Sequence, residues 1–294
     1  MDFNKKLGEY SEIINNALDM YLPETGCKQN EILKSMRYSL LAGGKRLRPA
    51  LLLEFCRISG GNTEAALPFA CALEMIHTYS LIHDDLPCMD NDDLRRGMQT
   101  NHKVFGEGMA VLSGDGLLNF AFEIMLDPEK SELPCGLLMR AAFEIACASG
   151  VFGMIGGQVI DLSFENGSPE LSEITHMDSL KTGALISAAC KAGCILAEAP
   201  KAYLEAASKY AAALGLAFQI KDDMLDVTGC EREIGKPVGS DKSRNIPTYM
   251  SLLGGQECAR LVDELTKKAV AAVIDLPDSE FLCALAEAMA GRGK

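Results

Sequence analysis

Two groups of aspartates interrupt apolar, helix-patterned sequence at widely separated places in the chain. The residues are Asp84, Asp85 and Asp90 in the first group and Asp222, Asp223 and Asp226 in the second. A carboxylate within an apolar helix is costly to bury unless a cation or water reaches it. The chain therefore has to fold so that both groups open onto a polar cavity. Two such groups that face one another would bind several divalent cations.

The rest of the sequence indicates that this cavity lies between helices. Ala, Leu, Met and Glu favour helix and are plentiful, whereas the alternating β-branched runs of a sheet are missing. Apolar periodicity and turn residues predict helices over 2–20, 29–42, 49–58, 64–86, 101–126, 134–160, 172–197, 200–229, 247–253 and 256–290. No linker rich in Pro or Ser divides the chain, so we expect a single all-α domain over residues 1–294 with a central active-site cavity.

Charge and cysteine usage exclude several classes of protein. The formal net charge of −13 argues against a nucleic-acid or anionic-membrane surface. The 11 cysteines contain no C-x-x-C pair, which favours reduced thiols in a cytoplasmic protein. Residues 1–8 are polar and charged, unlike a signal peptide. Because we find no apolar run of about 18 residues free of charges and turn signals, we expect no membrane span.

The second aspartate group has the spacing of a helical metal site. Asp222 and Asp226 lie about 40° apart on a helix, so both can point into one cavity. Mg²⁺ prefers one or two carboxylates together with water and phosphate oxygens, which such a face can supply. The alternative is a solvated acidic face, but Phe218, Ile220 and Leu225 surround the group with apolar side chains.

The first aspartate group works as a metal site only if its helix is distorted. Asp84 and Asp90 are six residues apart, which would place them on nearly opposite faces of a regular helix. Pro87 would break or bulge the helix between them. We therefore predict that the two carboxylates converge. The following residues, 91–93, are expected to cap the next segment and to face solvent.

Basic residues close to the first group define a second anion site. Segment 43–49 carries three cations after two glycines, and Arg95 and Arg96 follow the first aspartate group. Arg side chains match diphosphate oxygens, and Lys adds a point charge. His77 lies seven residues before Asp84, about 20° away on the same helix face, where it either donates to a phosphate or belongs to the core. Metal ions and cations together point to diphosphate binding.

Several motifs in order along the chain resemble one enzyme family. They are GGKRLRP at 43–49, HTYSLIHDDLPCMD at 77–90, DDLRRG at 92–97, GGQVID at 156–161, KTG at 181–183 and QIKDDMLD at 219–226. Together they are similar to trans-isoprenyl diphosphate synthases, particularly bacterial farnesyl diphosphate synthases, over essentially the whole chain. The resemblance implies the isoprenoid synthase fold, a homodimer, and Mg²⁺ as cofactor, with about three ions per active site when substrate is bound.

The resemblance also implies roles for individual residues. Asp84, Asp90 and Asp222 would bind Mg²⁺, and Asp85, Asp223 and Asp226 would support them, partly through bound water. Arg95, Lys181 and Lys236 would contact the allylic diphosphate. Lys45, Arg48, His77 and Arg96 would hold isopentenyl diphosphate. Lys181, Thr182 and Gln219 would line the place where the carbocation develops.

The implied reaction joins isopentenyl diphosphate to dimethylallyl or geranyl diphosphate by ionisation, condensation and elimination. Mg²⁺, Lys and Arg would stabilise the leaving diphosphate, and the cavity would keep out water that quenches the cation. The released diphosphate is the expected base, because no His or Glu is evidently placed for that role. A terpene cyclase or a non-catalytic partner subunit are the alternatives. The second D-D-x-x-D motif and the second anion site favour the coupling enzyme.

Product length is expected to depend on residues one turn before Asp84. Tyr79 is bulky and lies roughly 7–8 Å down the helix, next to the small Ser80. In the family an aromatic residue here limits growth, so we predict farnesyl diphosphate (C15), with geranylgeranyl (C20) or geranyl (C10) diphosphate as alternatives. If Tyr79 is only a core aromatic, the floor would lie elsewhere, for example on the helix carrying Val111, Leu112 and Phe120.

Three positions depart from the family pattern. Gln99 replaces a usual Pro, and Asp178 stands where a His often precedes the Lys-Thr-Gly segment. Both are expected to affect packing only. Ile246 replaces a usual Lys and removes one positive charge near the allylic diphosphate, for which Lys242 or Arg244 are candidate substitutes.

Overall fold

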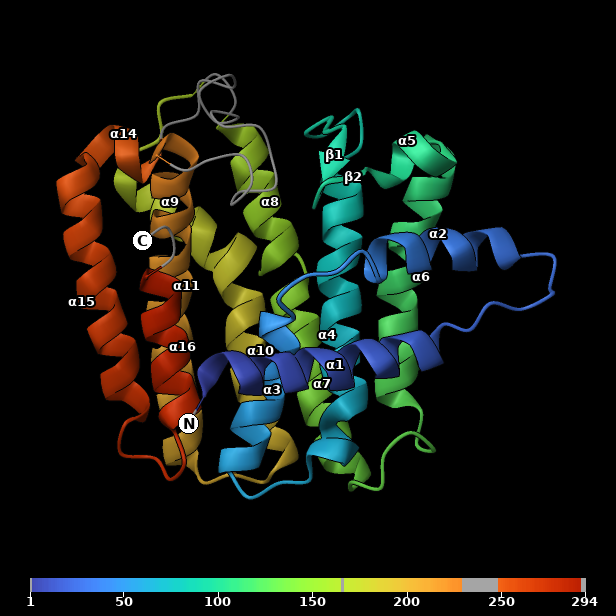
Figure 1. Cartoon of the computed structure of the whole chain (residues 1–294), viewed down its shortest axis with the longest axis horizontal. Coiled ribbons are helices and arrows are strands. Elements are labelled where there is room, and N and C mark those ends of the chain that lie inside the picture. The colour runs from blue at the N-terminus through green and yellow to red at the C-terminus, as the bar shows by residue number, and fades with distance from the viewer. Residues whose placement is uncertain (1, 165–166, 229–247, 292–294) are drawn as a thin grey trace.

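The computed structural model describes residues 2–164, 167–228 and 248–291, and these are almost entirely helical (Figure 1). The helices are α1 Phe3–Tyr21, α2 Asn30–Leu40, α3 Leu47–Ile58, α4 Thr63–Asp84, α5 Asn101–Phe105, α6 Glu107–Leu126, α7 Cys135–Ser149, α8 Met154–Ser163, α9 Leu171–Asp178, α10 Ala184–Leu196, α11 Lys201–Thr228, α14 Tyr249–Leu253, α15 Gly255–Val273 and α16 Glu280–Ala290. A π-helical turn, η1, spans Ser179–Gly183. Strand β1 (Leu94–Arg95) pairs antiparallel with β2 (Met98–Gln99). The all-α prediction is confirmed.

Three of the expected long helices are interrupted by turns. Segment 101–126 divides into α5 and α6 at Gly106, whose φ of 86° suits glycine. Segment 134–160 divides into α7 and α8 between Gly150 and Gly153, neither of which has helical backbone angles. Segment 256–290 divides into α15 and α16 at a turn in which Asp278 has a φ of 54°. The apolar periodicity of the sequence continues across each break although the helix ends there. The interruptions were therefore not predicted.

The core lies between four helices: α4 packs against α3, α3 against α10, and α10 against α11. Asn62 caps α4 by accepting hydrogen bonds from the backbone nitrogens of Glu64 (2.9 Å) and Ala65 (3.3 Å). Nearly every side chain of α4 between Ala66 and Ile82 is buried. A helix that is apolar on all faces belongs in the middle of a protein. α4 therefore carries the first aspartate group, at its end, from the centre of the bundle.

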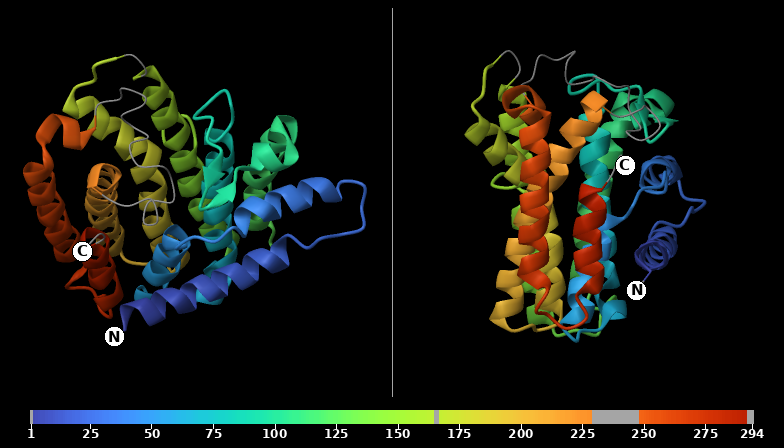
Figure 2. Two further views of the ribbon diagram at one scale, coloured as in Figure 1. Left: turned by 45° about the horizontal axis from the view of Figure 1, so that its top comes forward. Right: turned by 60° about the vertical axis from the view of Figure 1, so that its left-hand side comes forward.

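The elements that hold the expected site residues gather at one end of the bundle. α4 and α11 both run upward in Figure 1, so their C-terminal ends lie at the top, near α8, α9, α14 and the β1–β2 hairpin. The two views of Figure 2 show the same grouping, with α1 and α2 forming a separate layer on one side. The two aspartate groups, which end these two helices, are thus brought to the same end of the molecule.

Four described stretches have the length and apolar composition of a membrane-spanning helix: 63–84, 107–126, 135–163 and 171–196. Charged residues or turns interrupt each of these stretches, as the sequence suggested, but they leave the average hydropathy high. Burial within the protein explains the first stretch, of which 78% is buried. Only 28% of the third is buried, which leaves an apolar surface on α7 and α8.

Candidate active site

The first aspartate group lies where α4 ends, and the chain then folds back on itself. Leu86 and Asn91 are joined by a backbone hydrogen bond of 3.0 Å, and Asn91 has a left-handed φ of 54°. The backbone nitrogen of Asp90 donates to the carbonyl oxygen of Asp84 at 2.8 Å. The predicted distortion is confirmed, although the helix stops at Asp84 and does not bulge. The turn brings Asp90 beside Asp84, as the spacing required.

Asp85 is held by the hairpin that follows. Its side chain is buried and accepts hydrogen bonds from two nitrogens of the Arg95 guanidinium, Nε at 3.0 Å and Nη2. Arg95 also reaches Asp92 at 3.2 Å. The Arg95 expected to bind a diphosphate is therefore already ion-paired, so an incoming anion or metal ion would exchange partners with Asp85 and Asp92.

The surroundings of Asp84 disfavour its ionised carboxylate unless a cation lies nearby. Burial raises its pKa to about 6, and the neighbouring carboxylates Asp90 and Asp85 act in the same direction. Lys181 and Arg95 oppose the rise. A divalent cation placed between these carboxylates would remove both the repulsion and the desolvation penalty, so the donor set fits Mg²⁺.

Lys181 lies on the π-helical turn η1, between α9 and α10. Its ammonium pairs with Asp161 on α8 at 2.6 Å, and Asp84 and Asp90 also help to raise its pKa. Gly157 allows α8 to pack closely against η1, because a Cβ at that position would lie 2.2 Å from the Lys181 backbone nitrogen. π-Helical turns are rare and occur frequently at functional sites. The π-helical turn has no signature in the sequence, whereas Asp161 belongs to the GGQVID motif.

The second aspartate group lies near the end of α11, on the regular helix that its spacing predicted. Asp222, Asp223 and Asp226 are all partly buried. Asp223 accepts a hydrogen bond from the backbone nitrogen of Tyr249 at 2.8 Å, which ties α11 to the start of α14. Asp222 acts electrostatically on Arg48, so it faces the basic segment at 43–49.

The three cationic side chains of segment 43–49 have different surroundings. Arg46, at a left-handed φ of 49°, is buried and donates to Glu74 (2.6 Å), the Leu40 carbonyl (2.7 Å) and Asn15 (2.9 Å). Lys45 is exposed, and Nε of Arg48 is buried with no hydrogen-bond partner among the described residues. Arg48 can thus donate to an anion, while Arg46 joins α1, α2 and α4. Sequence reasoning missed Glu74, a buried acid three residues before His77.

Arg48, His77 and Arg96 form the rest of this basic cluster. Burial lowers the pKa of His77 well below its usual value, and Arg48, Arg96, Arg95 and Arg46 lower it further. His77 is therefore neutral near pH 7 when no anion is bound. Arg96 donates to the Gly43 carbonyl, and a Cβ on Gly44 would lie 2.9 Å from its guanidinium carbon. Gly44 leaves room for Arg96, and both Gly43 and Gly44 have positive φ angles (90° and 131°) that other residues rarely adopt.

Gln219, which we expected to line the cavity, has a hydrogen-bond partner at the end of α9. Its amide nitrogen donates to Oδ1 of Asp178 at 3.3 Å. The prediction that Asp178 affects packing only is wrong, because its buried carboxylate reaches across to α11. Burial raises the Asp178 pKa to about 6, whereas hydrogen bonds from Tyr249 and Gln219 lower it. Thr182 is partly buried on η1. Lys236, Lys242, Arg244 and Ile246 lie outside the described residues.

The two residues expected to limit product length lie on α4. Tyr79 is 6% exposed, its ring meets His83 edge-on at 5.7 Å, and burial raises its pKa to about 12. Its hydroxyl has no hydrogen-bond partner in the described part of the chain. The Ser80 hydroxyl donates to the carbonyl of His77 at 2.9 Å. A buried hydroxyl with no partner is compatible with a wall facing a cavity.

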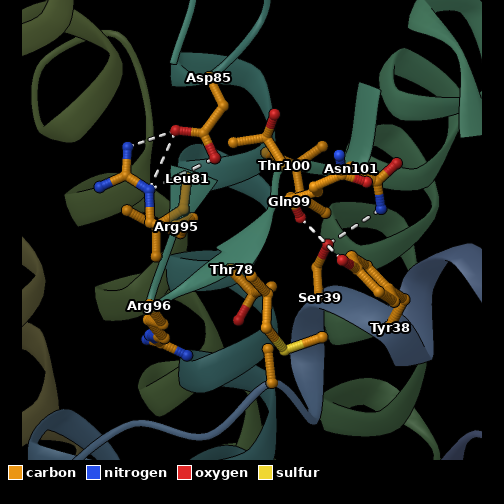
Figure 3. Close-up of a pocket in the computed structure, with 13 residues that line it drawn as sticks. Tyr38, Ser39, Thr78, Leu81, Asp85, Arg95, Arg96, Gln99, Thr100 and Asn101 are labelled. Carbon is orange, nitrogen blue, oxygen red and sulfur yellow. Dashed lines mark hydrogen bonds and ion pairs between the residues drawn. The ribbon is translucent and has the colours of Figure 1, made fainter. Parts of the chain in front are cut away.

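A small pocket lies beside this site, between α2, α4, α5 and the hairpin (Figure 3). Its volume is about 30 Å³, room for a few waters at most. Asp85, Arg95 and Arg96 line one side, and Tyr38 lies opposite, donating to the Gln99 carbonyl at 2.8 Å. Gln99 contributes its backbone carbonyl to this contact, and its side chain is exposed. The pocket is too small for either substrate.

Within residues 2–164, 167–228 and 248–291, no three His, Cys, Asp or Glu side chains form a metal site by themselves. The described carboxylates are therefore not arranged as a closed cage. This agrees with Mg²⁺, which is usually held by one or two carboxylates and completed by water and substrate phosphates.

Comparison with known proteins gives consistent matches. The model of the polyprenyl synthetase family matches residues 29–276. A farnesyl diphosphate synthase of Geobacillus stearothermophilus is 47% identical over 84% of this chain and 83% of its own. The large subunit 1 of a chloroplastic heterodimeric geranylgeranyl pyrophosphate synthase of Arabidopsis thaliana is 43% identical over 91% and 73%. A crystal structure of an FPP/GFPP synthase from Zymomonas mobilis superposes with a TM-score of 0.88 at 36% identity, covering 98% of this chain and 99% of that one.

Proposed function

The chain belongs to the polyprenyl synthetase family, and we propose that it condenses isopentenyl diphosphate with dimethylallyl and then geranyl diphosphate to give farnesyl diphosphate. One observation carries this proposal. Carboxylates at the ends of α4 and α11 lie at the same end of one bundle as Arg48, Arg96 and the neutral His77. A coupling enzyme needs two neighbouring diphosphate sites, whereas a hydrolase or cyclase needs one.

The allylic diphosphate would lie at the aspartate groups. Asp84, Asp90 and Asp222 would hold Mg²⁺, with Asp85, Asp223 and Asp226 as supporting residues. The bound ions would neutralise the diphosphate and make it a better leaving group. Burial and the neighbouring Asp90 and Asp85 raise the Asp84 pKa to about 6, and a bound cation would favour its ionised form.

Cationic side chains would complete both diphosphate sites. Lys181 and Arg95 are placed to exchange their carboxylate partners for the allylic diphosphate, together with Lys236. Lys45, Arg48, His77 and Arg96 would hold isopentenyl diphosphate. A neutral His77 would donate one hydrogen bond, and the approach of a diphosphate would raise its low pKa.

The space between the two sites would carry the reaction. Lys181, Thr182 and Gln219 would line the allylic carbon as the C–O bond breaks, with oxygen dipoles stabilising the developing positive charge. The alkene of isopentenyl diphosphate then forms the new C–C bond, and the released diphosphate takes the proton. Exclusion of water protects the cation. Tyr79, with Ser80, would end the tail cavity and set a C15 product.

We further propose that the chain forms a homodimer through α6, α7 and α8. α7 contacts both neighbours, and the turn after it carries the most exposed large side chain, Phe152, at 91% exposure. Apolar side chains on this surface are Val111, Leu112, Met139, Phe143, Val151, Phe152, Ile155 and Val159. Eight exposed large apolar side chains on neighbouring helices are unusual on a monomer and suit a second copy of the chain.

The test is incubation of the purified protein with Mg²⁺, isopentenyl diphosphate and each allylic diphosphate in turn, followed by chain-length analysis of the products. We expect farnesyl diphosphate from both dimethylallyl and geranyl diphosphate. Products longer than C15 would place the floor beyond Tyr79. Hydrocarbon release without isopentenyl diphosphate would indicate a cyclase, and no turnover would indicate a partner subunit.

A further inference from the structure

Asp178 is a buried carboxylate that the reaction outlined above does not use. It ends α9, directly before the π-helical turn that carries Lys181, and it is 6% exposed. Its neighbours come from distant parts of the chain. Gln219 on α11 donates to it at 3.3 Å, and the Tyr249 hydroxyl, on α14, also forms a hydrogen bond with it. Three helices therefore meet at this carboxylate.

The chemistry of the pair fixes the orientation of the glutamine amide. An ionised carboxylate only accepts hydrogen bonds, whereas an amide has one donating and one accepting end. Asp178 can therefore pair only with the NH₂ end of Gln219, which turns the amide oxygen away from α9. The Tyr249 hydroxyl also lies 3.3 Å from Oγ1 of Thr175, so its single proton is shared between Thr175 and Asp178. A histidine at 178 would impose no such choice, because imidazole can either donate or accept.

We propose that Asp178 is a positioning residue that holds the Gln219 amide with its oxygen facing the developing allylic cation. The inference deepens the proposed function and rests on it. In this orientation the amide dipole stabilises positive charge. If the amide turned over, its N–H groups would face the cation and oppose ionisation. The orientation acts in the transition state, so its loss lowers kcat more than it changes substrate binding.

The experiment is a double-mutant cycle with Asp178→Asn and Gln219→Met. Asn has the size of Asp but can donate to the amide oxygen, so it releases the orientation without opening a cavity. We expect D178N to lower kcat by about 10-fold, with both KM values within about 2-fold of wild type. In the Q219M background D178N should have no further effect, because the group it positions is gone. The matched control is Asp275→Asn, an exposed site that should change nothing.

A second measurement does not depend on turnover. In ¹⁵N-labelled, unliganded protein, the side-chain NH₂ signal of Gln219, assigned by its loss in Q219M, should exchange slowly with solvent and shift in D178N but not in D275N. An unchanged signal would overturn the inference even if the protein made no prenyl product. An active wild type whose D178N variant keeps its kcat, or loses the same factor in both backgrounds, would overturn it while leaving the proposed function intact.

Discussion

Arg46 shows how this fold stabilises a fully buried charge. Its guanidinium is fully enclosed and meets Glu74 at 2.6 Å, and both side chains are essentially inaccessible to solvent. Removing one member of such a pair leaves an unpaired charge in a poorly solvated place, typically at 3–5 kcal/mol. The pair also fixes the loop that presents Lys45 and Arg48, so its loss has consequences for both stability and binding.

We therefore expect Arg46→Met to lower the free energy of unfolding by about 3–5 kcal/mol and to raise the KM for isopentenyl diphosphate. The control is Arg260→Met, which breaks ion pairs with Glu257 and Glu264 in which every side chain is at least 40% exposed and which should cost about 1 kcal/mol or less. Urea unfolding and steady-state kinetics measure the two effects. The double variant R46M/E74M should recover much of the stability; equal losses in R46M and R260M would contradict this account.

Site residues with local determinants could be predicted from the sequence, and those with distant partners could not. The convergence of Asp84 and Asp90 followed from Pro87 and the spacing, and both are local. Asp178 meets Gln219 across 41 positions of sequence, and Arg46 meets Glu74 across 28. Nothing in a single sequence encodes such pairs. The signal that was available is a buried acid in apolar sequence, which applies to Glu74 as much as to the aspartate groups.

At the scale of helices, apolar periodicity predicted the elements and missed their interruptions. The breaks at Gly106 and at 150–153 fall where glycine allows non-helical angles, but glycines elsewhere continue a helix, for example Gly108 and Gly114 in α6. The π-helical turn at Ser179–Gly183 was not predicted, because five residues are too short a stretch for apolar periodicity to distinguish a π-helix from an α-helix. Close packing against α8 is what accommodates it.

Gly157→Ala tests whether this packing sets the position of Lys181. The new Cβ would lie 2.2 Å from the Lys181 backbone nitrogen, and backbone cannot move aside as a flexible side chain can. We expect a loss of about 1–3 kcal/mol in stability and a fall in kcat/KM on the order of 100-fold, because small displacements of a reacting site are costly. The control is Gly108→Ala, where nothing lies within 4 Å of the added carbon, and it should leave activity unchanged and stability equal or higher. Equal behaviour of the two variants would show that η1 is not set by α8.

For the molecule as a whole, the same helices serve the cavity and the outer surface. α6 packs against α4, the helix that ends at the first aspartate group, and α7 packs against α10, which continues from the Lys181 turn. A partner pressed on the outer faces of α6 and α7 would therefore brace the walls of the active site without entering it. Apolar residues on those faces explain why two helical stretches read as membrane spans while being only 39% and 28% buried.

The last prediction follows from this arrangement. Phe143 and Phe152 are 72% and 91% exposed, and a double change to Glu would place two charges in the centre of the proposed interface. Burying a charge opposite its symmetry copy is unfavourable, so we expect F143E/F152E to be monomeric at concentrations where the wild type is a dimer, as measured by analytical ultracentrifugation. Met20→Glu, at a site on α1 that is 73% exposed, controls for the added charge and should remain dimeric. A monomeric variant should also lose activity and unfold at lower temperature, since α6 and α7 lose their brace. A wild type that sediments as a monomer, or a variant that stays dimeric, would assign the apolar surface to another role.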